Sequence, residues 1–185
     1  MPEYARPRGS PWKVELLIVV LIVLAVAGLM VPVIWRTYQV SQTVRCQQQL
    51  TELFGAVQTY ARSFNGYAPG GPGWRGQLRA FLSPAEGAED ADPSRIWQCP
   101  AGGTYIGNAT VFGPNRKPLP ELGFQHDVGI LADGSADAEP AGLGDFRLVA
   151  WRHRGSANVI FLDGRVQLVT RNKAPWVGRH WDHPQ

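Results

Sequence analysis

An apolar segment near the amino terminus constrains this chain more than any other feature. Residues Leu16 to Ile34 form a run of 19 residues without a charged side chain, and Glu15 is the one charged residue between Val14 and Ile34. An α-helix rises about 1.5 Å per residue and needs about 20 apolar residues to cross the ~30 Å hydrocarbon layer of a bilayer. We therefore expect a transmembrane helix over residues 14–34.

A cleaved secretory signal is the alternative interpretation of this segment. The apolar core of a signal peptide usually spans about 7 to 15 residues and ends at a small-residue cleavage site. The run here is longer, and Tyr38 to Arg45 continue it as a polar segment suited to a helix. We therefore expect a retained anchor. Residues 1–13 should be cytoplasmic, because Arg6, Arg8 and Lys13 give a slight positive-inside bias.

Residues 35–65 are expected to continue the helix in amphipathic form. Pro32 lacks a backbone donor, which predicts a kink or a local loosening of the helix. Beyond it, apolar residues recur at helical spacings and polar residues fill the other side. The apolar stripe comprises Leu50, Leu53, Phe54, Val57, Tyr60, Ala61 and Phe64. Asn65 and Gly66 predict a left-handed cap at its end, which gives one helix of about 50 residues.

Residues 66–172 predict an α+β domain outside the membrane. Short apolar runs predict strands over 128–132, 146–151, 158–162 and 165–170. A turn is expected at Asp133-Gly134, and Asp163-Gly164 predicts a two-residue hairpin turn. The expected fold class is α+β, with the long helix packed on a small antiparallel sheet. Residues 173–185 form a tail, and the net charge of +3 is too small to indicate nucleic-acid binding.

Two cysteines, Cys46 and Cys99, complete the framework of this domain. A pair of cysteines outside the cytoplasm favours a disulfide, which would tie a loop before Pro100 to the helix. The alternative is a pair of buried thiols. We expect the bridge slightly more than the thiols.

His153 and Asp163 are the first candidates for chemistry. A catalytic histidine–aspartate pair needs a nucleophile within hydrogen-bond reach, such as Ser156 or Thr170. No Gly-x-Ser-x-Gly motif supplies one, and Asp163 has a sufficient role in a turn with Gly164. We therefore expect these residues to be structural, with Gly155 permitting an unusual dihedral angle beside His153, and we expect no enzymatic activity.

The amino-terminal features together resemble a known class. A positively charged leader, Glu15, an apolar run and Pro32 seventeen residues after the glutamate follow one another in order. This segment resembles the prepilin-type helix of type IV pilins and type II secretion pseudopilins. The resemblance implies a pilin-like fold and assembly through this helix, with Glu15 and Pro32 as its assembly residues.

The rest of the chain resembles one bacterial branch of pilin-like proteins, which carry a His-x9-Asp-Gly signature near the carboxyl end (domain of unknown function 1559). The matching residues are Cys46, Leu50 and Tyr60 on the helix, then "NGYAP", the Cys99-Pro100 dipeptide, "TYIGN", and finally His153, Asp163 and Gly164 of the signature. The resemblance covers most of residues 12–170.

The leader departs from the pattern of the family at one position. Prepilin peptidase cuts after a glycine five residues before the glutamate, and Ser10 stands there, followed by Pro11, with Gly9 one residue too early. We expect the leader to stay on. In pilins the glutamate pairs with the freed amino terminus of a neighbouring subunit, and without cleavage Glu15 lacks that partner.

Two metal sites were also considered. Asp133, Asp137 and Glu139 would be the carboxylates of a Ca²⁺ site such as some pseudopilins hold, but their spacing does not match an EF-hand and an acidic turn is preferred. His180 and His183, with Asp182, are spaced for one helical turn but lie in the tail. We therefore expect no cofactor, with Ca²⁺ as the weak exception.

The expected function is structural. The resemblance implies a single-pass protein of the bacterial inner membrane with its domain in the periplasm or at the cell surface. Its partners would be membrane lipid, copies of itself or other pilin-like subunits, prepilin peptidase, and pilus or secretion machinery. Two alternatives stay open: a monomeric anchored binding domain that presents residues 67–74 and 113–126, and an anchored hydrolase using His153 or the tail histidines.

Overall fold

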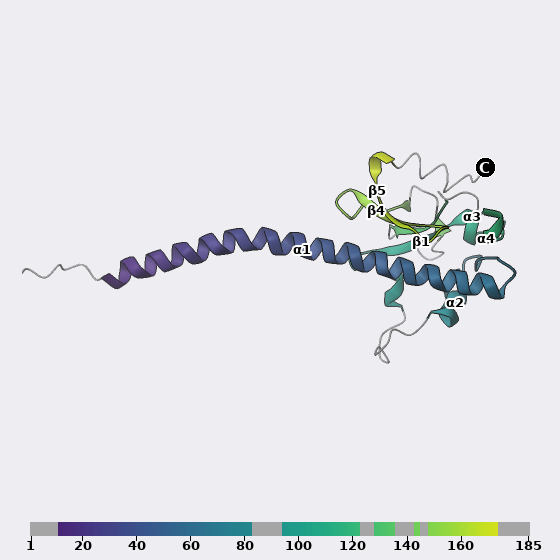
Figure 1. The fold of residues 1–185 in the computed structure, drawn as a ribbon, viewed down its shortest axis with the longest axis horizontal. Coiled ribbons are helices and arrows are strands. Elements are labelled where there is room, and N and C mark those ends of the chain that lie inside the picture. The colour runs from purple at the N-terminus through teal and green to yellow at the C-terminus, as the bar shows by residue number, and fades with distance from the viewer. Residues whose placement is uncertain (1–10, 83–93, 123–127, 136–142, 145–147, 174–185) are drawn as a thin grey trace, which may run out of the picture. The chain divides into compact units, whose positions relative to one another are not determined.

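The computed structural model describes residues 11–82, 94–122, 128–135, 143–144 and 148–173 (Figure 1). The chain divides into two units, residues 1–40 and 41–185, which are described in turn. One helix, α1 (Pro11–Ser63), contributes to both units.

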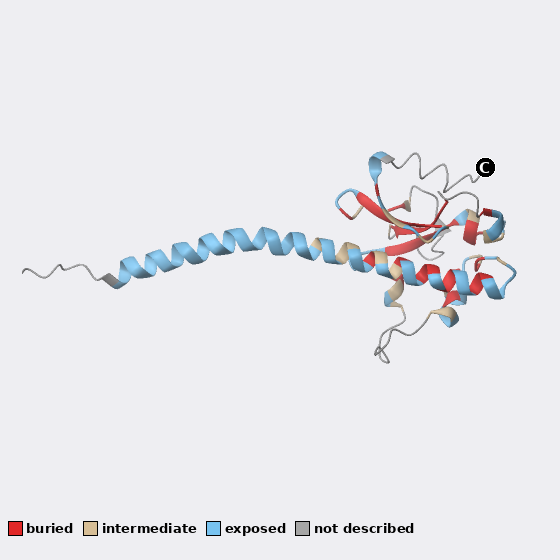
Figure 2. Cartoon of the chain, in the orientation of Figure 1, coloured by how far each residue is buried: buried red, intermediate tan, exposed pale blue. Residues whose placement is uncertain are grey.

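The first unit contains the apolar stretch of α1. No side chain from Trp12 to Tyr38 is buried, and the apolar residues of this stretch are exposed on every side of the helix (Figure 2). The helix continues through Pro32 without interruption. By length and composition, this helix is able to cross a membrane, as the sequence predicted.

The second unit begins with the amphipathic stretch of α1. Its buried side chains recur with each turn of the helix along one side, as an amphipathic stripe requires. They are Cys46, Leu50, Leu53, Phe54, Ala56, Val57, Tyr60 and Ala61. Phe64, which the sequence placed in the stripe, is 48% exposed, although its ring stacks on that of Tyr60 with centroids 4.2 Å apart.

The helix ends in the left-handed cap that the sequence predicted. Asn65 and Gly66 have φ angles of 52° and 84°. The backbone N–H of Gly66 donates to the carbonyl oxygen of Ala61 at 2.8 Å, which is the six-to-one bond of a Schellman motif. The chain therefore turns back at this point toward the rest of the domain.

A five-stranded sheet forms the other layer of the domain, in the order β3-β1-β2-β4-β5. The strands are β1 (Thr104–Asn108), β2 (Gly129–Gly134), β3 (Leu143–Gly144), β4 (Ser156–Phe161) and β5 (Val166–Thr170). Four strands pair antiparallel, and the two-residue β3 lies parallel to β1. The α+β class predicted from the sequence is confirmed.

Short helices fill the connections. They are α2 (Trp74–Leu78), η1 (Arg79–Phe81), η2 (Arg95–Trp97), α3 (Ala109–Phe112), α4 (Leu119–Leu122) and η5 (Arg171–Lys173). The larger core joins the buried stripe of α1 to one face of the sheet, with Trp74 and Phe112 among its largest side chains. A second, smaller cluster of buried apolar residues lies outside that core. It includes Phe161, Val149 and other residues of the strands.

Two predicted elements are wrong. A strand was expected over 146–151, but the described part of it, Leu148 to Trp151, makes only an isolated bridge from Val149 to Gly134. Asp133 and Gly134, expected as a turn, are instead the last two residues of β2 and are buried. A buried aspartate at the end of a strand needs polar partners, and these define the candidate site below.

The position of the tight turn also differs from the prediction. The turn at Asp163-Gly164 is a three-residue loop, in which the N–H of Phe161 donates to Arg165 O at 3.0 Å and Gly164 adopts φ 82°. The two-residue turn lies at the other end of β4, at Arg154-Gly155. His153 and Ser156 exchange backbone hydrogen bonds there, and both central residues have positive φ.

Candidate functional site

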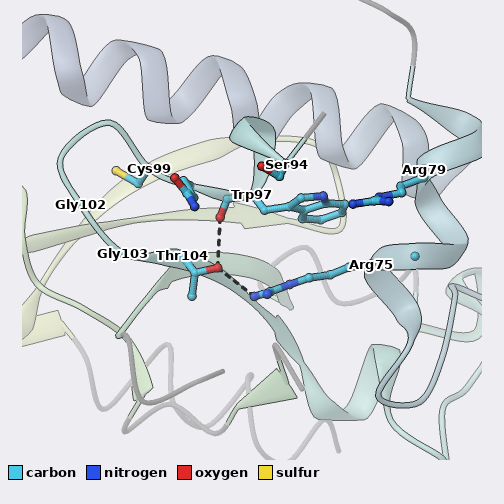
Figure 3. A pocket seen from close by; sticks show the side chains of 10 residues that line it. Arg75, Arg79, Ser94, Trp97, Cys99, Gly102, Gly103 and Thr104 are labelled. Carbon is cyan, nitrogen blue, oxygen red and sulfur yellow. Dashed lines mark hydrogen bonds between the residues drawn. The ribbon is translucent and has the colours of Figure 1, made fainter. Parts of the chain in front are cut away.

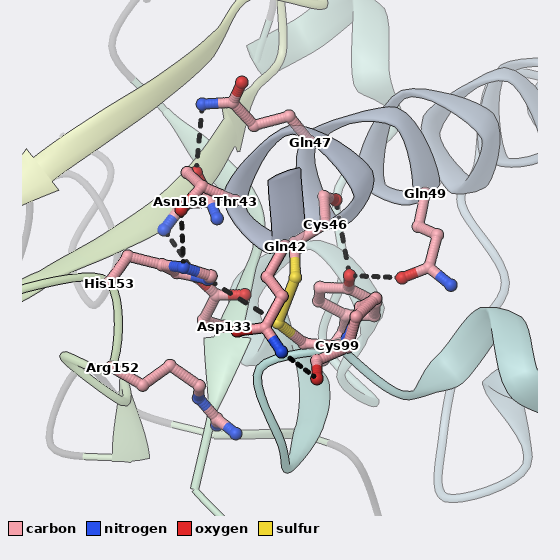
Figure 4. The surroundings of a disulfide bond; sticks show 12 residues. Gln42, Thr43, Cys46, Gln47, Gln49, Cys99, Asp133, Arg152, His153 and Asn158 are labelled. Atoms are coloured by element: carbon pink, nitrogen blue, oxygen red, sulfur yellow. Dashed lines mark hydrogen bonds and ion pairs between the residues drawn. A yellow bond between two sulfur atoms is a disulfide. The ribbon is translucent and has the colours of Figure 1, made fainter. Parts of the chain in front are cut away.

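A buried disulfide lies at the centre of the candidate site (Figure 4). It joins Cys46 on α1 to Cys99, which lies in the turn between η2 and β1, with a Cα–Cα distance of 5.2 Å. Gly102 and Gly103 form that turn with φ angles of 96° and 72°. The N–H of Cys99 donates to the carbonyl oxygen of Gly103 at 3.1 Å, so the turn holds the second cysteine against the helix.

The imidazole of His153 contacts the disulfide at Cys99. Its side chain is 3% exposed, and its Nε2 lies 3.5 Å from Cys99 Sγ and 3.2 Å from Asp133 Oδ2. Its Nδ1 lies 3.0 Å from the hydroxyl oxygen of Thr43 on α1. The imidazole is therefore fixed by contacts to the helix, the β2 strand and the disulfide.

Local backbone geometry explains the position of His153. The two-residue turn of Arg154 and Gly155 reverses the chain directly after His153 and starts β4 at Ser156. Arg154 adopts φ 55° and Gly155 φ 78°, which is the pattern of a type I′ turn. Gly155 therefore has the unusual dihedral angle that the sequence predicted, and it places the imidazole inside the domain.

Asp133 is the carboxylate of this cluster. It is fully buried, its Oδ2 accepts a 2.6 Å hydrogen bond from the backbone N–H of Asn158, and the same oxygen faces His153. Its Oδ1 has no hydrogen-bond partner among the described residues. A buried carboxylate oxygen without a donor is costly, so this atom marks the cluster as more than packing.

Polar residues of α1 surround the disulfide. The side-chain amide of Gln47 donates to Asn158 Oδ1 at 3.1 Å. The hydroxyl oxygen of Tyr105 lies 2.8 Å from Gln49 Oε1 and 3.3 Å from the carbonyl oxygen of Cys46. The turn carrying Cys99 is held further by a 3.3 Å bond from the Gln42 amide to Pro100 O.

Arg152 is a cationic residue whose charge acts on the carboxylate of Asp133. Its guanidinium donates to the carbonyl oxygen of Gly134 and fills the space beside Gly103. Partial burial lowers the pKa of Arg152, and the negative charge of Asp133 opposes that shift. Burial raises the pKa of Tyr105, with the charge of Asp133 adding to the effect, so the phenol stays neutral beside the cluster.

An open groove of about 690 Å³ lies beside the turn that carries Cys99 (Figure 3). Cys99 lines it, together with Arg75, Arg79, Trp97 and Thr104. The Arg75 guanidinium donates to Thr104 Oγ1 at 2.9 Å and lies 5.9 Å from the centroid of Trp97. The groove therefore combines cationic groups and an aromatic ring beside the turn that carries Cys99.

The structure does not pair His153 with Asp163. The two residues lie at opposite ends of β4, and Asp163 bonds within its own turn, accepting from the N–H of Arg165 at 2.9 Å. Gly164 follows it with φ 82°, and a Cβ there would meet the ring of Phe54. The two halves of the signature thus act separately, His153 in the buried cluster and Asp163-Gly164 in the hairpin.

The candidate nucleophiles also differ from those considered in the sequence. Ser156 and Thr170 are register partners on β4 and β5, whereas the hydroxyl facing the imidazole belongs to Thr43. In serine hydrolases the hydroxyl faces Nε2 and the carboxylate faces Nδ1, and here the order is reversed. The groove that Cys99 lines is lined by neither Thr43 nor His153. A molecule bound in this groove would therefore not meet the hydroxyl of Thr43 or the imidazole.

Other predicted residues are reported where the structure describes them. Asp133 belongs to the buried cluster, whereas Asp137 and Glu139 lie outside the described residues, and the Ca²⁺ site stays a prediction. The tail with His180, Asp182 and His183 lies outside them too, as do Gly9 and Ser10 of the leader; Pro11 begins α1. Glu15 and Pro32 lie on the exposed stretch of α1.

Four residues of the cluster carry atoms that bind metal ions. Single ligand atoms from Cys46, Cys99, Asp133 and His153 all lie within 4.8 Å of one another, and all four residues are buried. Sequence reasoning missed this set because Asp133 was assigned to a turn. Cys99 and His153 were quoted as parts of a motif, but nothing in their spacing indicated that they touch.

Comparisons of the chain with known protein families, with curated proteins and with solved structures found no match.

Proposed function

We propose that this protein is a non-enzymatic, membrane-anchored structural protein of the pilin and pseudopilin class. It is a subunit or accessory of a type IV pilus or type II secretion-like assembly. Residues 14–34 span the bacterial inner membrane, and the α+β domain lies in the periplasm or at the cell surface. The proposal includes membership of the branch with the His-x9-Asp-Gly signature.

The observation that carries this proposal is the change of surroundings along α1. The stretch from Leu16 to Ile34 exposes apolar side chains on every side, and the same helix then buries Leu50 and Leu53 in a domain core. An isolated helix that is apolar all round is stable only in lipid or against other apolar helices. Anchoring and lateral packing of such helices account for both stretches.

Assembly follows from the physics of helices in lipid. Apolar side chains give helices no hydrophobic reason to associate within a bilayer, so packing and small residues decide the contact. Ala25 and Gly28 are three residues apart, so they lie on one side of the exposed stretch and let a neighbouring backbone approach. Pro32 leaves the carbonyl oxygen of Gly28 without its usual helical donor, so the helix can bend at this position.

Cysteine crosslinking in native membranes tests the proposal. Single cysteines are introduced one at a time from Leu16 to Val31 in the full chain, and a membrane-permeable oxidant is added. Assembly predicts crosslinked species whose yield varies with helical periodicity along the scan. Gln48→Cys, at an exposed position of the domain stretch, is the matched control for random collision. Yields that never exceed this control would contradict assembly through the helix.

A second measurement on the same membranes concerns the leader. We expect the intact mass of the extracted chain to include residues 1–10, because Ser10 and Pro11 do not fit the peptidase pattern. A mature chain beginning at Ser10 or Pro11 would contradict retention of the leader.

The second candidate is a monomeric anchored binding domain. The groove lined by Arg75, Arg79 and Trp97 favours it, because cationic groups beside an aromatic ring suit an anionic ligand. This candidate predicts a monomer in membranes with no periodic crosslinks. The cysteine scan therefore discriminates between the two functions.

A further inference from the structure

We propose that, when Cys46 and Cys99 are both thiols, the buried cluster binds one Zn²⁺ ion. The ligands are the two cysteine sulfurs, Nε2 of His153 and one carboxylate oxygen of Asp133. The domain thus holds either a disulfide or a metal centre at the same place. This goes beyond the structural role proposed above and does not depend on it.

Two of the distances between ligand atoms already fit a tetrahedral site. With Zn–S bonds of about 2.3 Å and Zn–N and Zn–O bonds of about 2.1 Å, tetrahedral angles place nitrogen about 3.6 Å from sulfur and about 3.4 Å from oxygen. The observed separations are 3.5 Å from His153 Nε2 to Cys99 Sγ and 3.2 Å from Nε2 to Asp133 Oδ2. These two edges need almost no change.

The two sulfurs must separate before they can share a metal ion. They are bonded to each other in the disulfide, whereas two thiolates on one Zn²⁺ lie about 3.8 Å apart. Cys46 sits on the rigid helix α1, whereas Cys99 lies in a turn that contains Gly102 and Gly103. The turn is therefore the part of the site that would move to separate the two sulfurs.

The surroundings hold the ligands as a second shell would. Thr43 contacts Nδ1 of His153, and a hydroxyl both donates and accepts, so it supports either tautomer of the imidazole. With the ring N–H directed at Thr43, the Nε2 lone pair faces the sulfurs. Asn158 fixes the Asp133 carboxylate through its backbone N–H at 2.6 Å, which is the kind of partner that orients metal ligands.

Independent support comes from the unpaired oxygen of Asp133. The residue is fully buried, and Oδ1 has no hydrogen-bond partner among the described residues. An oxygen that lacks a donor retains lone pairs for a cation. Two thiolates and one carboxylate carry three negative charges, which Zn²⁺ and the neighbouring Arg152 together neutralise.

The exchange between the two forms is balanced. A dithiol reductant transfers two electrons and two protons to the disulfide, becomes a disulfide itself and leaves Cys46 and Cys99 as thiols. Zn²⁺ binding then releases the two thiol protons and forms two Zn–S bonds. Cys99 lines the groove beside Trp97, so this is the side from which a reductant would approach the bridge.

Cobalt spectroscopy on the full chain in detergent is the primary test. The protein is reduced, freed of metal without oxygen, and titrated with Co²⁺, which reports tetrahedral thiolate ligation through a sulfur-to-metal band and intense visible bands. We expect one Co²⁺ per chain, displacement by Zn²⁺, and no such bands in the oxidised protein. Re-oxidation should release the ion, measured as one Zn²⁺ per chain with a chromophoric chelator.

Variants separate the buried site from other histidines. His153→Ala and Asp133→Asn should weaken Zn²⁺ binding by more than the about 10- to 100-fold that the loss of an outer partner costs. Thr43→Val, which removes such an outer partner, should fall within that range. The matched controls are His180→Ala/His183→Ala in the tail and Asp163→Asn in the hairpin, and both should bind as the wild type does.

The result remains decisive where reduction unfolds the domain. If the dithiol chain unfolds, Zn²⁺ should restore its circular dichroism and its resistance to protease, because metal binding is coupled to folding. The proposal is overturned by reduced protein that binds no Co²⁺, or by bands that survive in the oxidised chain. It is equally overturned by binding that is lost in the tail variant but kept in His153→Ala.

Discussion

The two stretches of α1 share one backbone conformation and have opposite surroundings. From Trp12 to Tyr38 no side chain is buried, whereas from Ser41 to Ser63 one side of the helix is buried and the other meets solvent. The helical conformation alone therefore does not decide the environment. The difference is made by the polar residues opposite the stripe, such as Gln48 and Glu52, which the first stretch lacks between Leu16 and Ile34.

The largest expected effect concerns the bond that fastens the second stretch to the domain. Replacing Cys46 and Cys99 together by serine should lower the free energy of unfolding by about 4 kcal/mol, because the disulfide closes a separation of 53 residues. Denaturant unfolding of the full chain in detergent, followed by tryptophan fluorescence, measures it. An unchanged midpoint would show that the helix is held by packing alone.

A matched pair of leucines tests the contrast in burial. Leu53 is fully buried and Leu24 is 62% exposed. Leu53→Ala should destabilise the domain by about 3 kcal/mol through lost burial and a cavity. Leu24→Ala should change the same unfolding transition by less than about 0.5 kcal/mol. Equal effects of the two variants would mean that the first stretch also packs on protein.

An arginine introduced into each stretch of α1 tests whether that stretch lies in lipid or in water. Leu24→Arg should raise the free energy of membrane insertion by about 2.5 kcal/mol or more, because arginine near the centre of a spanning helix is costly. Gln48→Arg, on the exposed side of the second stretch, should insert as the wild type does. The fraction of chain that resists alkaline extraction from membranes reports the difference, and similar fractions for the two variants would break the comparison.

The smallest effect is a pH dependence from Glu52, on the exposed side of α1. Partial burial raises its pKa above the ordinary value of a glutamate, so the folded state holds this proton to a higher pH than the unfolded state does. The free energy of unfolding therefore falls as pH rises through that interval. Glu52→Gln should remove this loss and stabilise the domain by less than about 0.5 kcal/mol at neutral pH. At a pH well below the ordinary pKa of a glutamate, Glu52→Gln and the wild type should be equally stable. A difference in stability that persists at that pH would contradict the assignment to Glu52.

The elements that the sequence predicted are those fixed by local pattern. The helix, its cap at Asn65-Gly66 and the strands β2, β4 and β5 follow from periodicity and turn residues that lie within a few positions of one another. The tight turn was assigned to Asp163-Gly164 because Asp-Gly is the strongest short signal, yet Arg154-Gly155 forms it. Arginine does not favour a positive φ, so no local signal marks Arg154 as a turn residue.

The buried cluster was beyond reach of the sequence for a related reason. Asp133 follows an apolar run and precedes a glycine, which locally favours a turn, and only its pairing with Asn158 and His153 makes a buried position tolerable. Those partners depend on the register between β2 and β4. A strand register is not written in a single sequence when both strands are buried on each face, as these two are.

The place of the disulfide has a mechanical consequence. Cys46 lies near the start of the stretch that enters the domain, and Cys99 precedes β1, a strand with neighbours on both sides. A pulling force applied along α1 is therefore carried by the disulfide to β1, a central strand of the sheet. It reaches the noncovalent contacts between Cys46 and the end of the helix only afterwards. A helix bonded in this way resists stepwise detachment from its domain, one turn after another.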